Sequence, residues 1–157
     1  MTALNRIVIP YTPRALFRPY HARRQRWACL VVHRRAGKTV TCINDLVRAA
    51  VRLDKPDGRF AYVAPQLNQA KDVAWAYLKR YTAPLSPKIN EAELWVEVAN
   101  AAGHASRIRI YGADNSDRLR GGYFDGVILD EYADMGASVW GEIVRPMLAD
   151  RRGWATF

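Results

Sequence analysis

Three consecutive patterns between residues 27 and 53 constrain the fold more than any other feature of the sequence. An unbroken apolar run, 27–32 (WACLVV), has the length of a strand. The polar turn HRRAGKT follows at once, and apolar residues then recur at helical spacing from Lys38 to Leu53. This order predicts a buried strand that enters a long amphipathic helix through a tight turn. We expect Cys29 and Cys42 to be buried as small apolar residues.

Strand and helix patterns alternate along the rest of the chain. Strands are predicted at 59–64, 94–98, 107–111 and 126–129, the middle two as a hairpin, and helices at 68–81 and 138–148. Residues 1–26 are rich in proline and arginine, which predicts an extended lead-in with a helical turn around 20–26. The alternation favours one α/β domain with a mainly parallel sheet.

The charge of the chain is concentrated near its N-terminus. The net charge is +9, and up to residue 44 there are nine basic residues and no acidic one. From Asp45 onward fifteen basic residues balance fifteen acidic ones. A basic segment of this kind indicates an anionic partner, either a nucleic acid or a nucleotide.

Several classes of protein are excluded. The two cysteines form no C-x-x-C motif, and the three histidines have no metal-ligand spacing, which argues against a disulfide scaffold and a zinc site. There is no apolar run of about 18 residues and no secretory signal, so we expect no membrane association.

The triplet Gly37-Lys38-Thr39 lies where the predicted strand meets the predicted helix. Backbone N–H groups at a helix start favour phosphate, Lys38 can reach the β- and γ-phosphates, and the Thr39 hydroxyl can bind Mg²⁺. The phosphate-loop pattern G-x-x-x-x-G-K-[ST] has glycine where this chain has Val32. The alternative is that the triplet merely begins an amphipathic helix.

A second motif, GVILDE at 126–131, is an apolar strand that ends in two carboxylates. In a phosphate-loop ATPase, Asp130 would bind Mg²⁺ and Glu131 would orient the attacking water. Because no N-K-x-D segment for guanine is present, ATP is favoured over GTP. The alternative is a strand that simply ends at the surface.

Together these residues resemble a known family. The segments FRPYHARRQRW, HRRAGKT (Walker A), APQ, SDRLRG and VILDEYADM (Walker B) are similar to the ATPase domain of the large terminase subunit, the DNA-packaging motor of tailed bacteriophages and prophages. The similarity runs from Phe17 to Phe157, and in this family the Val32 departure is expected. It implies a P-loop NTPase fold of the ASCE/RecA-like type, with helices flanking the sheet.

The resemblance also implies roles for individual residues. The nucleotide-binding loop would comprise His33, Arg34, Arg35, Ala36, Gly37, Lys38 and Thr39. Arg34 would contact the γ-phosphate in cis, whereas Arg120 would reach a neighbouring subunit's site or belong to an ordinary basic loop. Adenine would be read by His21, by Gln25 or by neither.

The resemblance further implies the organisation of the chain. Residues 1–26 would form a basic, adenine-side lead-in and 27–157 the ATPase domain, truncated before the family's coupling motif and therefore incomplete at its C-terminus. The nuclease domain would be absent. We expect the loop residues Asp114, Asp117 and Asp125 to be solvated or to form turns.

The implied activity is ATP hydrolysis, with Mg²⁺, that drives double-stranded DNA into a procapsid in the host bacterial cytoplasm. The implied partners are the portal protein, the small terminase subunit and other copies in a ring, so the isolated chain would be weakly active or inactive. Two alternatives are a helicase-like DNA-dependent ATPase and a non-enzymatic basic DNA-binding remnant.

Overall fold

The computed structural model describes residues 7–157, which contain a seven-stranded sheet in the order β1-β7-β6-β2-β5-β4-β3. The first five strands of this order, β1, β7, β6, β2 and β5, are parallel to one another. Strand β4 is antiparallel to β5, and β3 is antiparallel to β4. The strands are β1 (Trp27–Ala28), β2 (Gly58–Ala64), β3 (Lys88–Asn90), β4 (Trp95–Ala99), β5 (Ala105–Gly112), β6 (Gly126–Leu129) and β7 (Trp154–Thr156). The predicted α/β class and the predicted β4–β5 hairpin are therefore confirmed.

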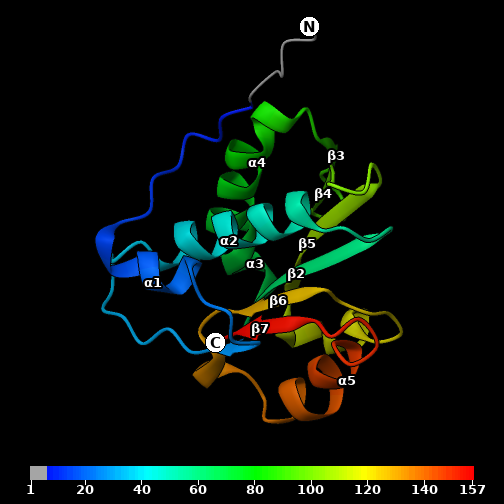
Figure 1. Cartoon of the computed structure of the whole chain (residues 1–157). Coiled ribbons are helices and arrows are strands. Elements are labelled where there is room, and N and C mark those ends of the chain that lie inside the picture. The colour runs from blue at the N-terminus through cyan, green and yellow to red at the C-terminus, as the bar shows by residue number, and fades with distance from the viewer. Residues whose placement is uncertain (1–6) are drawn as a thin grey trace, which may run out of the picture.

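Helices cover both faces of the sheet, as Figure 1 shows with α2 and α4 on one side and α5 on the other. On the first side lie α2 (Lys38–Arg52) and a continuous helical segment made of α3 (Leu67–Ala70), a π-helical turn (Lys71–Trp75) and α4 (Ala76–Thr82). On the second side a π-helical turn (Val139–Val144) leads into α5 (Arg145–Met147). No helix within 7–157 is long and apolar enough to cross a membrane.

The core forms because the central strands are buried on both faces. On one face, Ile43 and Leu46 of α2 pack with Phe60, Ile108 and Ile128 of the sheet. Residues of the opposite face, including Val63, Val127 and Leu129, pack with Val144 and Leu148. The near-continuous apolar strands FAYVA and GVIL follow from this two-sided burial.

The strand before the glycine turn is shorter than predicted, and the expectation for Cys29 is wrong. Only Trp27–Ala28 pair within the sheet, whereas Cys29 is exposed and Val31 is 92% exposed. The reason is that β1 lies at the sheet edge, where β7 is its one partner strand among residues 7–157. After Leu30, whose N–H donates to Phe157 O at 2.8 Å, the chain leaves the sheet. Cys42 is buried as predicted.

Two other expectations need correction. The lead-in turns lie earlier than predicted, at Ala15–Phe17 and α1 (Arg18–His21), because proline at position 19 occupies the first turn of α1. Asp125 is buried rather than solvated, because it accepts hydrogen bonds from the Arg59 N–H and from Arg151, each at 2.9 Å. Residues 1–6 of the proposed lead-in lie outside the described part of the chain.

Strands β6 and β7 meet closely at a glycine. Gly126 is paired with Trp154, and a Cβ atom at position 126 would lie 2.4 Å from the Trp154 indole. The indole therefore occupies the space that any side chain at position 126 would need.

Candidate nucleotide site

The turn between β1 and α2 has the backbone of a phosphate-binding loop. Arg35 and Gly37 adopt positive φ angles of 63° and 98°, and Gly37 immediately precedes the first residue of α2. Left-handed residues next to a helix start turn successive N–H groups toward one side, which forms an anion-binding concavity. Glycine suits position 37 because other residues are strained at such an angle.

Lys38 meets the two carboxylates that follow β6. Its Nζ lies 2.9 Å from Asp130 Oδ1 and 3.1 Å from Glu131 Oε1. Residues so distant in sequence meet because the last residue of β6 and the first residue of α2 lie at the same end of the parallel strands. Burial alone would lower the pKa of Lys38, but the two carboxylates outweigh it and raise that pKa. The lysine is therefore held as a cation beside the loop.

Tyr62 supports this acidic pair and was not predicted from the sequence. Its hydroxyl, in the middle of β2, donates a hydrogen bond to Asp130 Oδ2. Burial, followed by the neighbouring Asp130 charge, raises the pKa of Tyr62 well above its usual value, so the hydroxyl remains a donor. The available signal was a hydroxyl group within the otherwise apolar strand FAYVA.

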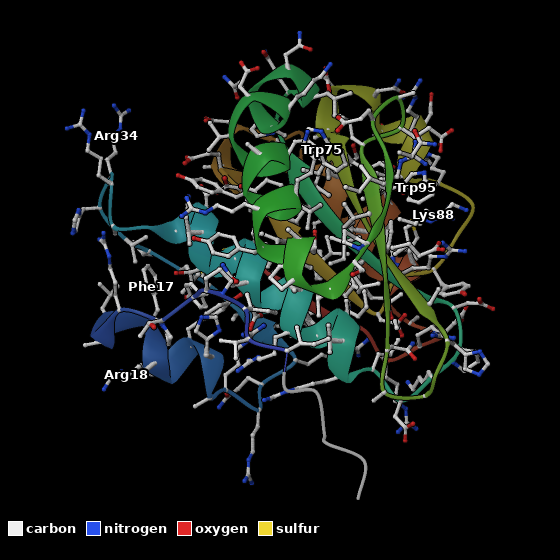
Figure 2. All side chains as sticks on the ribbon, turned by 90° about the horizontal axis from the view of Figure 1, so that it is seen from above. Phe17, Arg18, Arg34, Trp75, Lys88 and Trp95 are labelled. Carbon is white, nitrogen blue, oxygen red and sulfur yellow. The ribbon has the colours of Figure 1, made fainter. Side chains whose placement is uncertain are left out.

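A hollow of about 540 Å³, here called the loop pocket, opens beside these groups. Its lining comprises Arg14, Val32, His33, Arg34, Arg35, Ala36, Gly37, Lys38, Thr39, Val40, Val73, Tyr77 and Glu131. The structure thus brings the whole predicted loop together with Glu131. Arg34 lies at the exposed tip of the loop and projects away from the body of the domain (Figure 2).

Arg14 is a second residue that sequence reasoning missed. Its Nη1 donates to the backbone oxygen of Ala36 at 2.8 Å, and its guanidinium group lies over Gly37. No sequence motif connects the proline-rich lead-in to the loop, although the two residues are only 22 positions apart. The contact indicates that the lead-in helps to hold the loop in place.

A smaller hollow of about 210 Å³ adjoins the loop pocket, because Arg14, Gly37 and Val40 line both. Its remaining lining is Pro10, Tyr11, Thr12, Thr41 and Tyr81. Tyr11 and Tyr81 pack edge to face, with their ring centroids 6.0 Å apart. This aromatic chamber beside a phosphate loop has the chemistry of a nucleobase site.

The two residues considered for adenine lie elsewhere. Both ring nitrogens of His21 are engaged, Nε2 with the Tyr11 hydroxyl at 2.8 Å and Nδ1 with Asp45 Oδ1 at 3.2 Å. Gln25 accepts a hydrogen bond from the Arg24 N–H. Both line a different hollow, so the structure does not bring them to the loop pocket.

Arg120 also lies apart from the loop pocket. It lines a hollow of about 250 Å³ together with four other arginines, and its Nε is 3.6 Å from Asp117. None of the phosphate-loop residues lines that hollow.

The oxygen donors beside Lys38 suit Mg²⁺. Within residues 7–157 no group of three or more His, Cys, Asp or Glu side chains could hold a metal ion by itself. Mg²⁺ commonly takes one or two protein oxygens together with phosphate oxygens and water. The Asp130 carboxylate and the Thr39 hydroxyl supply such a pair, so the residues fit the ion.

Comparisons with known proteins show what the chain resembles. No family model matches the chain. It is 50% identical over 50 residues to the terminase large subunits of Thermus phage G20c and Thermus virus P23-45, matches that cover 32% of this chain and 10% of each relative.

Solved structures extend the comparison to nearly the whole chain. The large terminase ATPase domain of Thermus phage P74-26 superposes with a TM-score of 0.81 at 25% identity, covering 94% of this chain and 64% of that one. The large terminase of another thermophilic bacteriophage, solved in complex with ADP, shares the fold, with a TM-score of 0.69 at 18% identity over 83% of this chain and 32% of that one.

This chain thus spans less than two thirds of the proteins it resembles. Over that span the family resemblance seen in its motifs is confirmed: in sequence and in fold, the chain is similar to the ATPase domain of phage large terminase subunits.

Proposed function

We propose that this domain binds and hydrolyses ATP. The observation that carries the proposal is the convergence of Lys38, Asp130 and Glu131 beside a phosphate-type loop. In this arrangement the loop N–H groups and Lys38 hold the β- and γ-phosphates. Glu131, whose side chain is 64% exposed, would exchange its contact with Lys38 for a water molecule that it orients toward the γ-phosphate.

The adenine base is assigned to the aromatic chamber of Tyr11 and Tyr81. The chamber shares three lining residues with the loop pocket, so one ligand can occupy both. His21 then acts indirectly, because the hydrogen bond between its Nε2 and the Tyr11 hydroxyl fixes the position of that hydroxyl. This assignment replaces direct reading of adenine by His21 or Gln25.

Thr39 and Asp130 are assigned to Mg²⁺, which would neutralise phosphate charge when bound. Arg34 and Arg120 remain candidates for neutralising further phosphate charge. Arg34 would act on the nucleotide of its own chain, and Arg120 would act on the nucleotide of a neighbouring subunit. Because Arg120 lies outside its own chain's loop pocket, the two roles left for it are contact with a neighbouring subunit's site and membership of an ordinary basic loop.

The larger role follows from the relatives. The proteins that this chain resembles are named as terminase large subunits. We therefore assign the domain to a motor that moves double-stranded DNA into a procapsid in the bacterial cytoplasm. Its partners there would be the portal protein, the small terminase subunit and a ring of its own copies.

Calorimetry with ATP and with ADP tests the nucleotide site. Wild type should bind both, Lys38→Ala should lose binding, and Glu131→Gln should bind ATP without turning it over. Arg18→Ala, which removes an exposed arginine outside both nucleotide hollows, is the matched control. Undiminished binding by Lys38→Ala would exclude the assigned phosphate site.

A further inference from the structure

Seven of the nine basic residues of the N-terminal segment line one of two separate hollows. Arg14, Arg34, Arg35 and Lys38 line the loop pocket. Three others, Arg23, Arg24 and Arg26, line a second hollow of about 540 Å³, here called the distal pocket. Its other lining residues are His21, Gln25, Asp45, Arg48, Ala49, Arg52, Arg152 and Trp154.

The outer side of the distal pocket, around Arg52, lies far from the phosphate loop. Lys38 is the first residue of α2 and Arg52 the last. At a rise of 1.5 Å per residue, the two ends of this helix are about 20 Å apart. A nucleotide bound at the loop therefore leaves the distal arginines without a phosphate partner.

The single carboxylate that lines the distal pocket is already paired with two arginines. Asp45, whose side chain is 3% exposed, lies 2.7 Å from Arg23 Nη2 and 3.0 Å from Arg48 Nη2. Arg26 is likewise engaged, because its guanidinium donates to the backbone oxygens of Gly153 and Leu148. These contacts fix the inner wall of the pocket.

Three arginines on the rim remain unengaged. Arg24, Arg52 and Arg152 are exposed, and their guanidinium groups form no hydrogen bond or ion pair with any residue from 7 to 157. They come from three separate segments: the turn after α1, the end of α2 and the turn before β7. Six arginines against one carboxylate give the hollow a strongly positive potential, which an anion would relieve.

We propose that the distal pocket binds the phosphate backbone of DNA, through Arg24, Arg52 and Arg152. The guanidinium fork matches phosphate oxygens in a way that lysine does not, and no lysine lines this pocket. The choice of DNA as the polyanion rests on the proposed motor function. The existence of the anion site rests on the arginines alone.

The other arginine-rich hollow, around Arg120, is a weaker candidate because carboxylates already oppose much of its charge. Arg107 is paired with Glu97 at 2.9 Å, and Arg109 lies 3.9 Å from Glu93. Arg120 itself faces Asp117. An anion would compete with these carboxylates there, whereas the distal rim offers unopposed guanidinium groups.

Fluorescence anisotropy with a short labelled DNA duplex over a salt series tests the inference. The variant Arg24→Ala/Arg52→Ala/Arg152→Ala should bind at least ~10-fold more weakly at moderate salt. Its slope of log K against log salt should be shallower by about 2.7, because each phosphate contact contributes about 0.9. Since these guanidinium groups make no internal contacts, the variant should fold normally.

Arg18→Ala/Arg80→Ala/Arg145→Ala removes the same charge from exposed sites outside the distal pocket and serves as the matched control. An equal loss in both triple variants, no loss in either, or no duplex binding by wild type would overturn the site. So would a loss confined to Arg59→Ala/Arg118→Ala in the other hollow, or tighter binding of polyglutamate than of DNA.

Nucleotide binding by the same variants separates the two proposals. The distal variant should bind ADP like wild type, because none of its changed residues lines the loop pocket. If wild type binds duplex through the distal arginines but binds no nucleotide, the ATPase proposal fails and the anion site stands. The reverse result leaves the ATPase proposal intact and removes the site.

Discussion

Two acid–base networks on α2, one at the middle of the helix and one at its first residue, use similar residues in opposite ways. In the distal pocket, Asp45 is held by Arg23 and Arg48 with its side chain 3% exposed. At the loop pocket, Lys38 contacts Asp130 and Glu131, whose side chains are 14% and 64% exposed. Burial locks the first network into the fold, whereas exposure leaves the second able to exchange partners with a ligand. Access to solvent therefore distinguishes an acid–base network that is fixed in the fold from one that a ligand can displace.

The largest effect should follow from removing the buried carboxylate. Asp45→Asn leaves Arg23 and Arg48 without their counter-ion, which should lower the free energy of unfolding by about 3–5 kcal/mol. Asp130→Asn should cost less, because Lys38 keeps Glu131 as a counter-ion and its own side chain is 25% exposed. Urea denaturation of both variants measures the difference. Equal losses would refute the distinction between a locked and an exchangeable network.

The next effect concerns the loop pocket alone. Tyr62→Phe removes the hydrogen bond that orients Asp130. If Asp130 holds Mg²⁺, loss of this supporting contact should weaken Mg²⁺ affinity about 10-fold or more. Calorimetric titration of the ADP-bound protein with Mg²⁺ measures this. Tyr77→Phe, in the wall of the same pocket, is the matched control, and comparable affinities in both variants would contradict the role of Tyr62.

Acid should affect the distal network through Asp45. Burial would raise the pKa of Asp45, but hydrogen bonds from His21 and Arg23 outweigh it, so the pKa is lowered in the folded state. A lowered folded pKa stabilises the fold above the unfolded pKa of about 3.9, and that stabilisation is lost as the pH falls further. The stability difference between wild type and Asp45→Asn should therefore stay constant near neutral pH and shrink below about pH 4. Urea unfolding at a series of pH values measures it, and an unchanged difference at low pH would count against the buried ion pair.

The smallest effect should come from Arg14. Its exposed guanidinium holds the Ala36 backbone oxygen, so Arg14→Ala should change the free energy of unfolding by no more than ~0.5 kcal/mol. Losing one charge-assisted hydrogen bond beside the phosphate loop should nevertheless weaken ATP binding roughly 10-fold. Calorimetry compares this variant with Arg24→Ala in the distal pocket, whose ATP affinity should not change. A wild-type affinity in Arg14→Ala would show that the lead-in does not support the loop.

The sequence predicted those parts of the fold that periodicity and turn residues determine locally. The predicted helix at 38–53 is observed as Lys38–Arg52, and the strand GVIL lies where expected. The strand predicted at 27–32 is longer than the observed β1, because an apolar run does not reveal whether a strand is central or lies at the sheet edge. Within the site, Lys38, Asp130 and Glu131 were found because each belongs to a motif.

Arg14, Tyr62 and the chamber of Tyr11 and Tyr81 could not be found in the same way. Each contributes through contacts between separate segments of the chain, and such contacts exist only in the folded domain. For the same reason, the sequence does not show which arginines gather around the distal pocket. Arg24 belongs to the basic segment, but Arg52 and Arg152, its neighbours on the rim, lie in the electrically balanced remainder of the chain.

The close meeting of β6 and β7 has a consequence for how this domain can evolve. Because the Trp154 indole fills the space beside Gly126, position 126 cannot accept a side chain while Trp154 is unchanged. Among homologues, a larger residue at position 126 should occur only where position 154 has become small. Such paired variation would reveal, from sequences alone, the contact between β7 and β6, the strand that Asp130 and Glu131 follow.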